Sequence, residues 1–207
     1  MEAAWAVPTA IGGALVLWSL GAACTGRFAV ENARYTVIKA HPTFEVRAHP
    51  PHVIASIVTP EAAMKSASSS AFRSLAGFIF GRNEQSSSIA MTSPVTISPG
   101  AAGHTVWFVL PAKYHAVEEV PAPLDRRVLL SLVPRGLSAV RPLRATWGER
   151  LDSARFREEA AALLRDVGAR GLRVPQGEVP RQLAYDPPWT PFWMRRDEVS
   201  VAVEEGS

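Results

Sequence analysis

The sequence is poor in cysteine, and this excludes two common ways of stabilising a small protein. Its 207 residues include one cysteine, Cys24. An intramolecular disulfide and a zinc cluster with cysteine ligands each need at least two thiols. The fold must therefore depend on a hydrophobic core, and a chain of this length can form one domain of ordinary size with an appendage.

The chain also lacks a long run of basic residues. Its 22 lysines and arginines are scattered among 19 acidic residues, for a formal net charge of +3. Binding to nucleic acid depends on positive charge that is gathered on one face of the protein. We therefore expect no nucleic-acid partner.

The motifs of several enzyme classes are missing as well. Ser93 is not part of a Gly-x-Ser-x-Gly elbow, and the sequence has neither a phosphate-binding glycine loop nor a His-Glu-x-x-His pair. These absences favour a binding protein over an enzyme.

Formal charge is absent from Ala3 to Gly26. A helix of this length would reach about 36 Å, and the hydrocarbon core of a bilayer is about 30 Å thick. We interpret residues 1–30 as an N-terminal transmembrane anchor or uncleaved signal, followed by a domain over residues 31–207. A cleaved signal peptide, a lipoprotein signal ending at Cys24 and a buried core helix are the alternatives, although a basic start, typical of both signals, is missing.

The residues that flank this segment predict its orientation. Arg27, Arg34 and Lys39 follow it, whereas Glu2 precedes it. Positive charge favours the cytoplasmic side of a membrane, so we expect a single-pass protein with its domain in the cytosol. If the segment is cleaved, the domain would instead be secreted or lumenal.

The remainder of the chain predicts an α+β fold. Thr59-Pro60-Glu61 is typical of a helix start, and apolar residues at helical spacing continue to Ile79, before Gly81 and Asn83. A second helix is predicted near residues 151–167, ending at Gly168. Runs rich in β-branched and aromatic residues predict strands at 35–38, 44–47, 53–58, 89–97, 105–110, 128–133, 137–146, 182–185 and 198–203, with another near Leu172. Strands, a helix and strands, repeated once, indicate an antiparallel sheet with two helices packed on it.

Several short motifs follow one another in an order that is specific when they are taken together. They are Phe44-Glu45-Val46-Arg47, Phe78-Ile79-Phe80-Gly81-Arg82-Asn83, Ile89-Ala90-Met91-Thr92-Ser93-Pro94-Val95, Phe108-Val109-Leu110-Pro111, Pro121-Ala122-Pro123-Leu124-Asp125, Tyr185-Asp186-Pro187-Pro188-Trp189-Thr190-Pro191 and Arg195-Arg196-Asp197-Glu198-Val199. Over about residues 33 to 203 the chain resembles the SOUL haem-binding protein family of the GyrI-like superfamily. The resemblance implies a distorted antiparallel β-barrel or twisted sheet of two pseudo-symmetric halves, flanked by two α-helices.

The resemblance also implies that the domain binds haem or a related tetrapyrrole in an apolar cleft beside the first helix. Such a site needs an apolar slot for the macrocycle and cations for its propionates. The residues that we assign to it are Phe72, Leu75, Ala76 and Ile79 for the slot wall, Tyr185 near the partner strand, and Arg195 and Arg196 for the propionates. An apolar helix face beside a sheet is equally typical of core packing, and both interpretations stay open.

His49 is the candidate iron ligand, but the sequence departs from the family pattern here. The ligating histidine of the best-known histidine-ligated member follows the arginine of the Phe-Glu-Val-Arg-type motif directly, and Ala48 has that position in this chain. A shift of one residue along a strand turns a side chain to the opposite face. Ser69 also stands where another haem-binding member has a basic residue. The resemblance therefore implies weak or no axial ligation.

Two functions follow from these observations. The first is a membrane-anchored protein that holds haem or another tetrapyrrole, not necessarily as an obligatory cofactor, by apolar enclosure. The alternative is a membrane-tethered protein-interaction or adaptor module of the same fold without physiological haem binding, because a fold alone does not determine activity.

Overall fold

The computed structural model describes residues 30–60, 64–100, 103–143, 154–186, 190 and 194–205, with the backbone alone for residues 64–70. The predicted N-terminal anchor lies outside the described residues except for Val30, so it stays a prediction. No helix within the described ranges has the length and hydropathy needed to cross a membrane. The predicted first turns of both helices and residues 187–189 of the Pro-Pro-Trp motif also lie outside the described residues.

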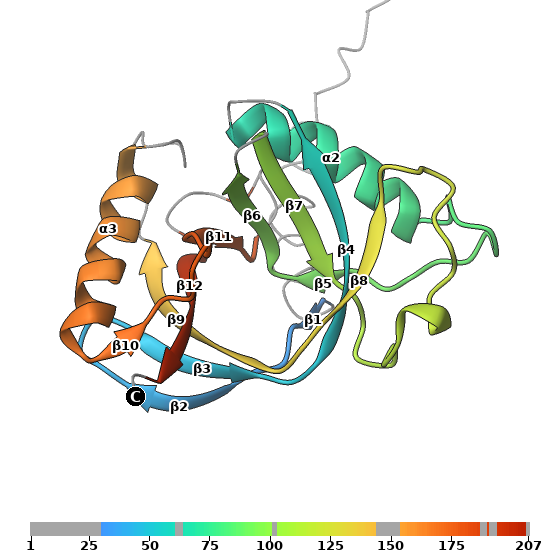
Figure 1. The fold of residues 1–207 in the computed structure, drawn as a ribbon. Helices are drawn as coiled ribbons and strands as arrows, with labels where there is room; N and C mark the ends of the chain where they lie inside the picture. The colour runs from blue at the N-terminus through green and yellow to red at the C-terminus, as the bar shows by residue number, and fades with distance from the viewer. Residues whose placement is uncertain are drawn as a thin grey trace, which may run out of the picture. The chain divides into compact units, whose positions relative to one another are not determined.

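The described residues form two α-helices, one short 3₁₀ helix and twelve strands. The helices are α2 (Met64–Ile79), η1 (Val117–Glu119) and α3 (Ala154–Ala169). The strands are β1 (Glu31–Asn32), β2 (Thr36–Ala40), β3 (Glu45–His49), β4 (His52–Thr59), β5 (Thr92–Ser93), β6 (Val95–Gly100), β7 (Gly103–Val109), β8 (Leu129–Val133), β9 (Gly136–Leu143), β10 (Leu172–Arg173), β11 (Arg181–Ala184) and β12 (Asp197–Glu205). Two helices with a large curled antiparallel sheet make the α+β fold that the sequence predicts (Figure 1).

The sequence predicts the end of α2 correctly but places the end of α3 too early. Gly81 has a φ of 107°, which glycine adopts readily, and Asn83 Nδ2 donates to the Phe78 carbonyl oxygen at 3.0 Å, so the predicted end of α2 is confirmed. Gly168, by contrast, lies inside α3. The residue with positive φ after α3 is Gly171, at 73°.

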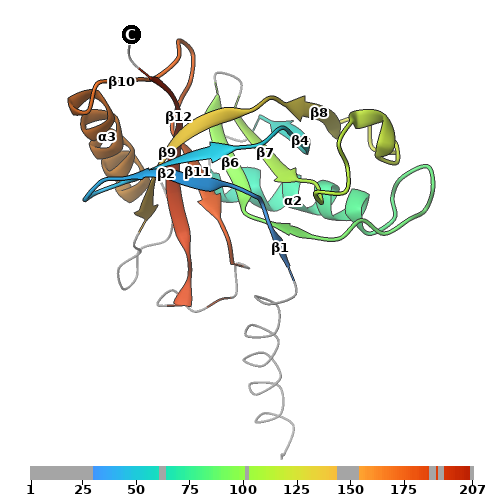
Figure 2. The same cartoon turned by 90° about the horizontal axis from the view of Figure 1, so that it is seen from below.

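The large sheet has the order β2-β3-β9-β12-β11-β6-β7-β4-β8, and β10 pairs with β12. Only Pro50 and Pro51 separate β3 from β4, and only Pro134 and Arg135 separate β8 from β9. Strand β3 pairs with β9 while β4 pairs with β8, so these two bent segments lie antiparallel along their length. Each of the two segments runs from a strand near one end of the strand order to a strand near the other end, and the sheet is curled (Figure 2).

The pairing has an internal pseudo-symmetry. Strand β4 pairs with β7 and β8, and β9 pairs in the same way with β12 and β3. Strand β6 pairs with β7 and β11, and β11 pairs with β12 and β6. The pairing is therefore reproduced when each element is exchanged for its counterpart in the other half: β3 with β8, β4 with β9, α2 with α3, β6 with β11 and β7 with β12. These are the two similar halves expected from the order of elements.

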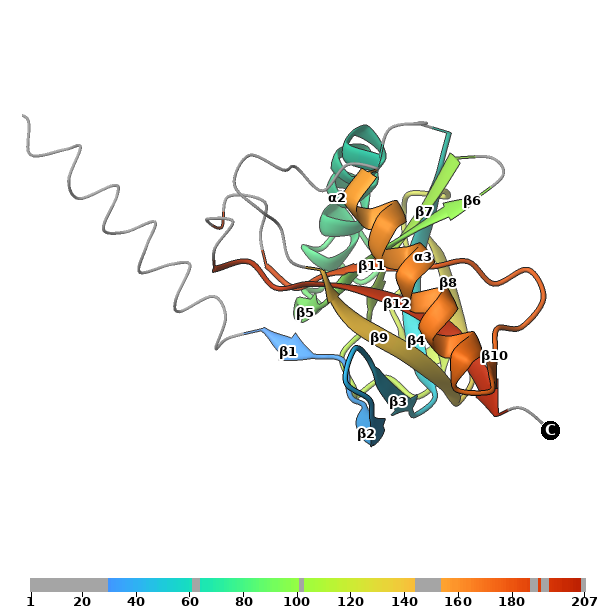
Figure 3. The same cartoon turned by 90° about the vertical axis from the view of Figure 1, so that its left-hand side faces the viewer.

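Both helices pack on the same face of the sheet, which we call the helix-packed face. Helix α2 covers a buried cluster that includes Leu75, Phe78 and Phe108, on β4, β6 and β7. Helix α3 covers a second cluster that includes Leu163 and Val201, on β3, β9 and β12 (Figure 3). Alternation along each strand places the neighbouring side chains on the opposite, helix-free face.

The helix-free face is polar and nevertheless buried. The register places five polar residues there, Arg47, Thr96, Ser138, Glu198 and Ser200, and each is between 3% and 8% exposed. Within the described residues no helix covers them. Buried polar groups are tolerated only when they have partners.

Candidate functional site

A buried ion pair joins the two strands that flank β9 on the helix-free face. Arg47 on β3 donates from Nη1 to Glu198 Oε2 at 2.6 Å and from Nη2 to Glu198 Oε1 at 3.1 Å. The guanidinium and the carboxylate therefore meet through two hydrogen bonds, the strongest geometry for this pair of groups. Residues that are 151 positions apart in the chain are held together here.

Two further side chains complete the shell of Glu198. The Tyr185 hydroxyl donates to Glu198 Oε2 at 2.8 Å, and Arg196 Nη2 donates to Oε1 at 2.9 Å. Burial alone would raise the pKa of Glu198, but the hydrogen bonds and charge of Arg47 outweigh it, and the pKa lies below its usual value. Burial raises the pKa of the Tyr185 hydroxyl, which keeps its proton as the donor. Glu198 is thus a carboxylate with three partners.

Aromatic rings lie against both arginines. The Arg47 guanidinium is 4.3 Å from the centroid of the Tyr35 ring, and the Arg196 guanidinium is 4.0 Å from that of Tyr185. Arg196 Nη2 also donates to the Tyr35 hydroxyl at 3.4 Å. We call Tyr35, Arg47, Tyr185, Arg196 and Glu198 the Arg47 network.

A groove of about 750 Å³ borders this network and shares Tyr35 with it. The groove combines small apolar side chains, one aromatic ring, one imidazole and two guanidinium groups. Its lining residues are Ala33, Arg34, Tyr35, Thr36, Ala48, His49, Pro50 and Arg135. We call it the Tyr35–His49 groove, and its volume lies within the range of about 300–1,000 Å³ that is usual for small-molecule sites.

His49 is held within this groove by hydrogen bonds. Its Nε2 lies 2.7 Å from Ser138 Oγ, and the ring also has a backbone hydrogen bond with Arg34. Burial, together with the charges of His52, Arg47 and Arg181, lowers the pKa of His49 to about 4. The imidazole is neutral at neutral pH, which is the form that coordinates a metal, but both contacts hold its ring in place.

The structure separates the predicted site residues into two groups on opposite faces of the sheet. Tyr185 and Arg196 belong to the Arg47 network, and His49 lines the adjacent groove. Arg195 precedes Arg196, and its charge acts on Asp197 of the helix-packed face, where it lowers the carboxyl pKa against the larger effect of burial.

The four predicted residues of the slot wall lie on α2, on the helix-packed face. Leu75 and Ile79 are at most 1% exposed and belong to the core under α2. Phe72 is half-buried, with its ring edge against Phe108 at 5.6 Å between centroids, and Ala76 is half-buried. The structure therefore shows Leu75, Ile79 and Phe72 in core contacts and does not bring the α2 residues together with Tyr185, Arg196 and His49.

Five further site residues were not predicted from the sequence: Arg47, Glu198, Tyr35, Arg34 and Arg135. Arg47 and Glu198 lie inside two of the motifs on which the family resemblance rests. Strand alternation gives no signal for these two, because each lies one residue away from an apolar core residue, Val46 or Val199, and is therefore expected on the other face of its strand. Their burial depends on the pairing of each with the other.

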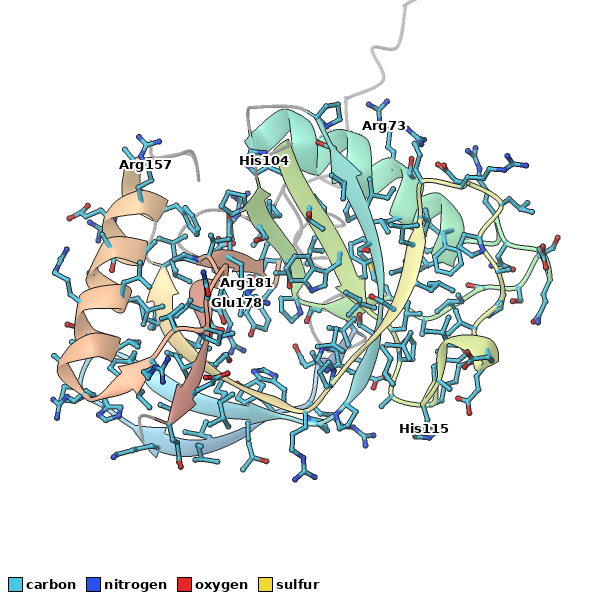
Figure 4. All side chains as sticks on the ribbon, in the orientation of Figure 1. Arg73, His104, His115, Arg157, Glu178 and Arg181 are labelled. Atoms are coloured by element: carbon cyan, nitrogen blue, oxygen red, sulfur yellow. The ribbon has the colours of Figure 1, made fainter. Side chains whose placement is uncertain are left out.

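The central and peripheral charges of the domain differ in their surroundings. Arg181 and Glu178 lie near the middle of the fold and form an ion pair at 2.5 Å, whereas Arg73, Arg157 and His115 lie at its periphery (Figure 4).

Within the described residues no group of three or more histidine, cysteine, aspartate or glutamate side chains has the arrangement of a metal site.

Comparison with known proteins adds a family and a set of similar folds. The model of the family described as SOUL heme-binding protein matches residues 30–202. No curated protein matches the chain.

Solved structures with the same fold include two of EcmrR. Its C-terminal domain is 12% identical, with a TM-score of 0.52, and the match covers 83% of this chain and 98% of that one. The match to EcmrR in a complex with DNA is also 12% identical, with a TM-score of 0.56, and covers 92% of this chain and 64% of that one. A hydrolase from Listeria innocua is 12% identical, with a TM-score of 0.50, and the match covers 88% and 98% of the two chains. At these identities the similarity establishes the fold alone.

Proposed function

This chain belongs to the SOUL heme-binding protein family, and from that premise we propose that it binds haem or a related tetrapyrrole in the Tyr35–His49 groove. We choose this groove as the site because it brings apolar walls, two cations and an imidazole together. The face of α2 that packs on the sheet offers core contacts instead.

The chemistry of the groove fits a flat pigment with carboxylate groups. Ala33, Ala48, Pro50 and the Tyr35 ring supply apolar contact area, and Arg34 and Arg135 supply positive charge. A guanidinium group binds a carboxylate through two parallel hydrogen bonds. We therefore assign the propionates of the pigment to Arg34 and Arg135.

Binding at this site depends less on the iron of the pigment than on its macrocycle. His49 has the neutral imidazole that ligation needs, but Ser138 and the Arg34 backbone already hold the ring. Haem iron, when bound, would supply an open coordination position, and His49 could bind it only by giving up one of these hydrogen bonds. We propose that the groove encloses the pigment with weak or no ligation by His49.

The proposal is tested by titrating the full chain with haemin and, separately, with metal-free protoporphyrin IX. We expect saturable absorbance changes for both pigments, with dissociation constants within about tenfold of each other, because ligation contributes little. The Arg34→Ala/Arg135→Ala double variant should weaken binding of both pigments by about tenfold or more, because charge-assisted hydrogen bonds to the propionates are lost.

Arg73→Ala is the matched control, because it removes a charge of the same sign from the exposed side of α2 (Figure 4). It should leave both titrations unchanged. Absence of saturable binding at micromolar protein would remove the proposed function. Binding that survives in the double variant but is lost in Ala76→Asp on α2 would move the site to the helix.

A further inference from the structure

The flat guanidinium of Arg47 is held at two of its edges. Its Nη1 and Nη2 donate to the Glu198 carboxylate at 2.6 and 3.1 Å, and its Nε and Nη2 donate to Glu45 Oε2 at 3.0 and 2.9 Å. The N–H donors of a guanidinium lie in the plane of the group. Two carboxylates bound at its edges therefore fix the direction in which its faces point.

The ring of Tyr35 lies over one of these faces. Its centroid is 4.3 Å from Cζ of Arg47, and its hydroxyl accepts a hydrogen bond from Arg196 Nη2 at 3.4 Å. Arg196 Nη2 also donates to Glu198 Oε1 at 2.9 Å. The two arginines that contact Tyr35 are thus held by one buried carboxylate.

Strand pairing does not fix Tyr35. It lies between β1 and β2, one residue before β2 begins, and its side chain is half-buried. A side chain in such a place has several rotamers open to it unless neighbouring groups select one. The same ring lines the Tyr35–His49 groove, and its centroid is 6.1 Å from that of the His49 ring. The shape of the groove therefore depends on what holds Tyr35.

We propose that Glu198 is a positioning residue for the pigment, because it holds the Tyr35 ring, through Arg47 and Arg196, in one orientation as a wall for the macrocycle. This inference rests on the proposed function and adds to it the residue that shapes one side of the groove. Glu198 is 5% exposed and does not line the groove, so it acts through Tyr35 and not by contact with the pigment.

The charges of the network favour this positioning role over an electrostatic one. The positive charges of Arg47 and Arg196 are paired with the negative charges of Glu45 and Glu198. Because these charges offset one another, the four groups add little attraction for the carboxylates of a pigment. Their contribution to the groove is the orientation of the Tyr35 ring.

The test is a double-mutant cycle on the affinity of the full chain for protoporphyrin IX. We expect Glu198→Gln to weaken binding about tenfold, because the amide keeps the shape of the side chain but loses the charge that holds both arginines. Tyr35→Ala should weaken binding by a similar factor, and adding Glu198→Gln to it should change the affinity by less than about twofold. A merely structural role of Glu198 would make the two losses additive.

Arg47→Lys is a second variant that leaves the buried Glu198 carboxylate with a cation. Lysine lacks the flat face and the fork of donors, so this variant should also weaken binding, and its effect should disappear in the Tyr35→Ala background. Glu159→Gln on α3 is the matched control, because Glu159 pairs with Arg141 at 3.0 Å on the helix-packed face and its side chain is 14% exposed. It should lower stability and leave the affinity unchanged.

A measurement without pigment separates this inference from the proposed function. The chain has three tyrosines, Tyr35, Tyr114 and Tyr185, so fluorotyrosine labelling gives three fluorine NMR resonances, which replacement of each by Phe assigns. We expect Glu198→Gln to move the Tyr35 resonance towards its position in the unfolded chain, because the ring is no longer held. The Tyr114 resonance should stay in place, because its ring contacts a lysine outside the network.

The outcomes distinguish the two proposals. An unmoved Tyr35 resonance in Glu198→Gln, or additive losses of affinity in the cycle, would overturn the positioning role. An unchanged affinity with a shifted resonance would overturn it as well, since the orientation of the ring would not matter to the pigment. A native chain that binds no pigment, although the Tyr35 resonance shifts as expected, would instead overturn the proposed function and with it the pigment as the reason for the positioning.

Discussion

The two faces of the curled sheet are both buried, but they are buried in different ways. On the helix-packed face, α2 and α3 cover two clusters made of apolar side chains. On the helix-free face, the shielded residues include Arg47, Ser138 and Glu198, and they are joined by hydrogen bonds and ion pairs. Apolar burial is not directional and tolerates repacking, whereas a buried charge is stable only with its partner in place. The first face therefore supplies most of the stability, and the second supplies a defined arrangement of functional groups.

Each face also contains residues of the other kind. On the helix-packed face, Arg141 of β9 pairs with Glu159 and Asp166 of α3 and is more exposed than Arg47. On the helix-free face, Val140 is 1% exposed and belongs to neither apolar cluster, and it lies in register with Glu45 and Ser200. Arg141 and Val140 are neighbours on β9, so strand alternation places the charge on one face and the apolar side chain on the other.

The largest expected effect is on the helix-packed face. Phe78→Ala should lower the free energy of unfolding by about 3–5 kcal/mol, because it removes a fully buried ring and leaves a cavity beneath α2. Phe80→Ala, two residues further on, removes a ring that is 67% exposed and should change stability by less than about 0.5 kcal/mol. Urea denaturation of both variants checks this. Equal losses would mean that the α2 face is not the core.

The next effect is on the Arg47 network. Arg47→Met should cost about 3 kcal/mol, because Glu198 loses its bidentate partner, although Arg196 still neutralises part of its charge. Arg141→Met on the opposite face should cost about 1 kcal/mol, because its ion pairs are more exposed. Unfolding in urea measures both. A smaller loss for Arg47→Met than for Arg141→Met would contradict the assignment of a buried network to the helix-free face.

The faces should also respond to pH in opposite directions. Burial raises the pKa of Asp197, on the helix-packed face, to about 6 from 3.8. The folded protein then binds this proton more tightly than the unfolded chain, so its contribution to stability is present below about pH 4 and is lost as the pH rises through 6. Asp197→Asn should remove this loss and stabilise the protein at pH 7 by about 2–3 kcal/mol.

His49, on the helix-free face, has the opposite sign. Its pKa is lowered to about 4 from 6.5, so its contribution is present above pH 6.5 and is lost as the pH falls towards 4. His49→Gln should flatten the acid side of the stability profile, and Asp197→Asn should flatten the other side. Thermal unfolding between pH 4 and 7.5 measures both profiles. Changes in the same direction would show that the two environments are alike.

The smallest expected change in stability concerns Ser138. Ser138→Ala removes the hydrogen bond to His49 Nε2 and should cost about 1 kcal/mol. If Ser138 holds the imidazole away from a bound iron, this variant should also shift the Soret band of the haemin complex, and the Ser138→Ala/His49→Ala double variant should not. An identical spectrum in all three proteins would mean that His49 does not approach the iron even when its ring is released.

Most elements of the fold were predictable from local patterns, because the spacing of apolar residues follows from the geometry of a helix or strand. Residues 89–97, predicted as one strand, form β5 and the start of β6, separated by Pro94. The family resemblance was predictable for a different reason, since it rests on short motifs in a defined order.

The site was less predictable than the fold. Leu75 and Ile79 have the spacing that a cleft wall or a core face would both require, and periodicity alone does not distinguish the two. Tyr185, Arg196 and His49 were recognised singly, whereas Arg47 was not, because its importance depends on Glu198 at the far end of the chain. Local sequence patterns do not show which residues far apart in the chain form a pair.

The amino-acid order by itself determined where the helices and strands of the described domain lie, which of their residues face a core, and the family to which the chain belongs. It also contains the uncharged segment from Ala3 to Gly26, whose role stays a prediction. Only the tertiary structure decided which apolar faces are fully covered and where a groove opens, because these depend on how distant segments fill space. It also decided which charges meet, since the electrostatic energy of Arg47 and Glu198 is set by their distance and burial and not by their separation in sequence.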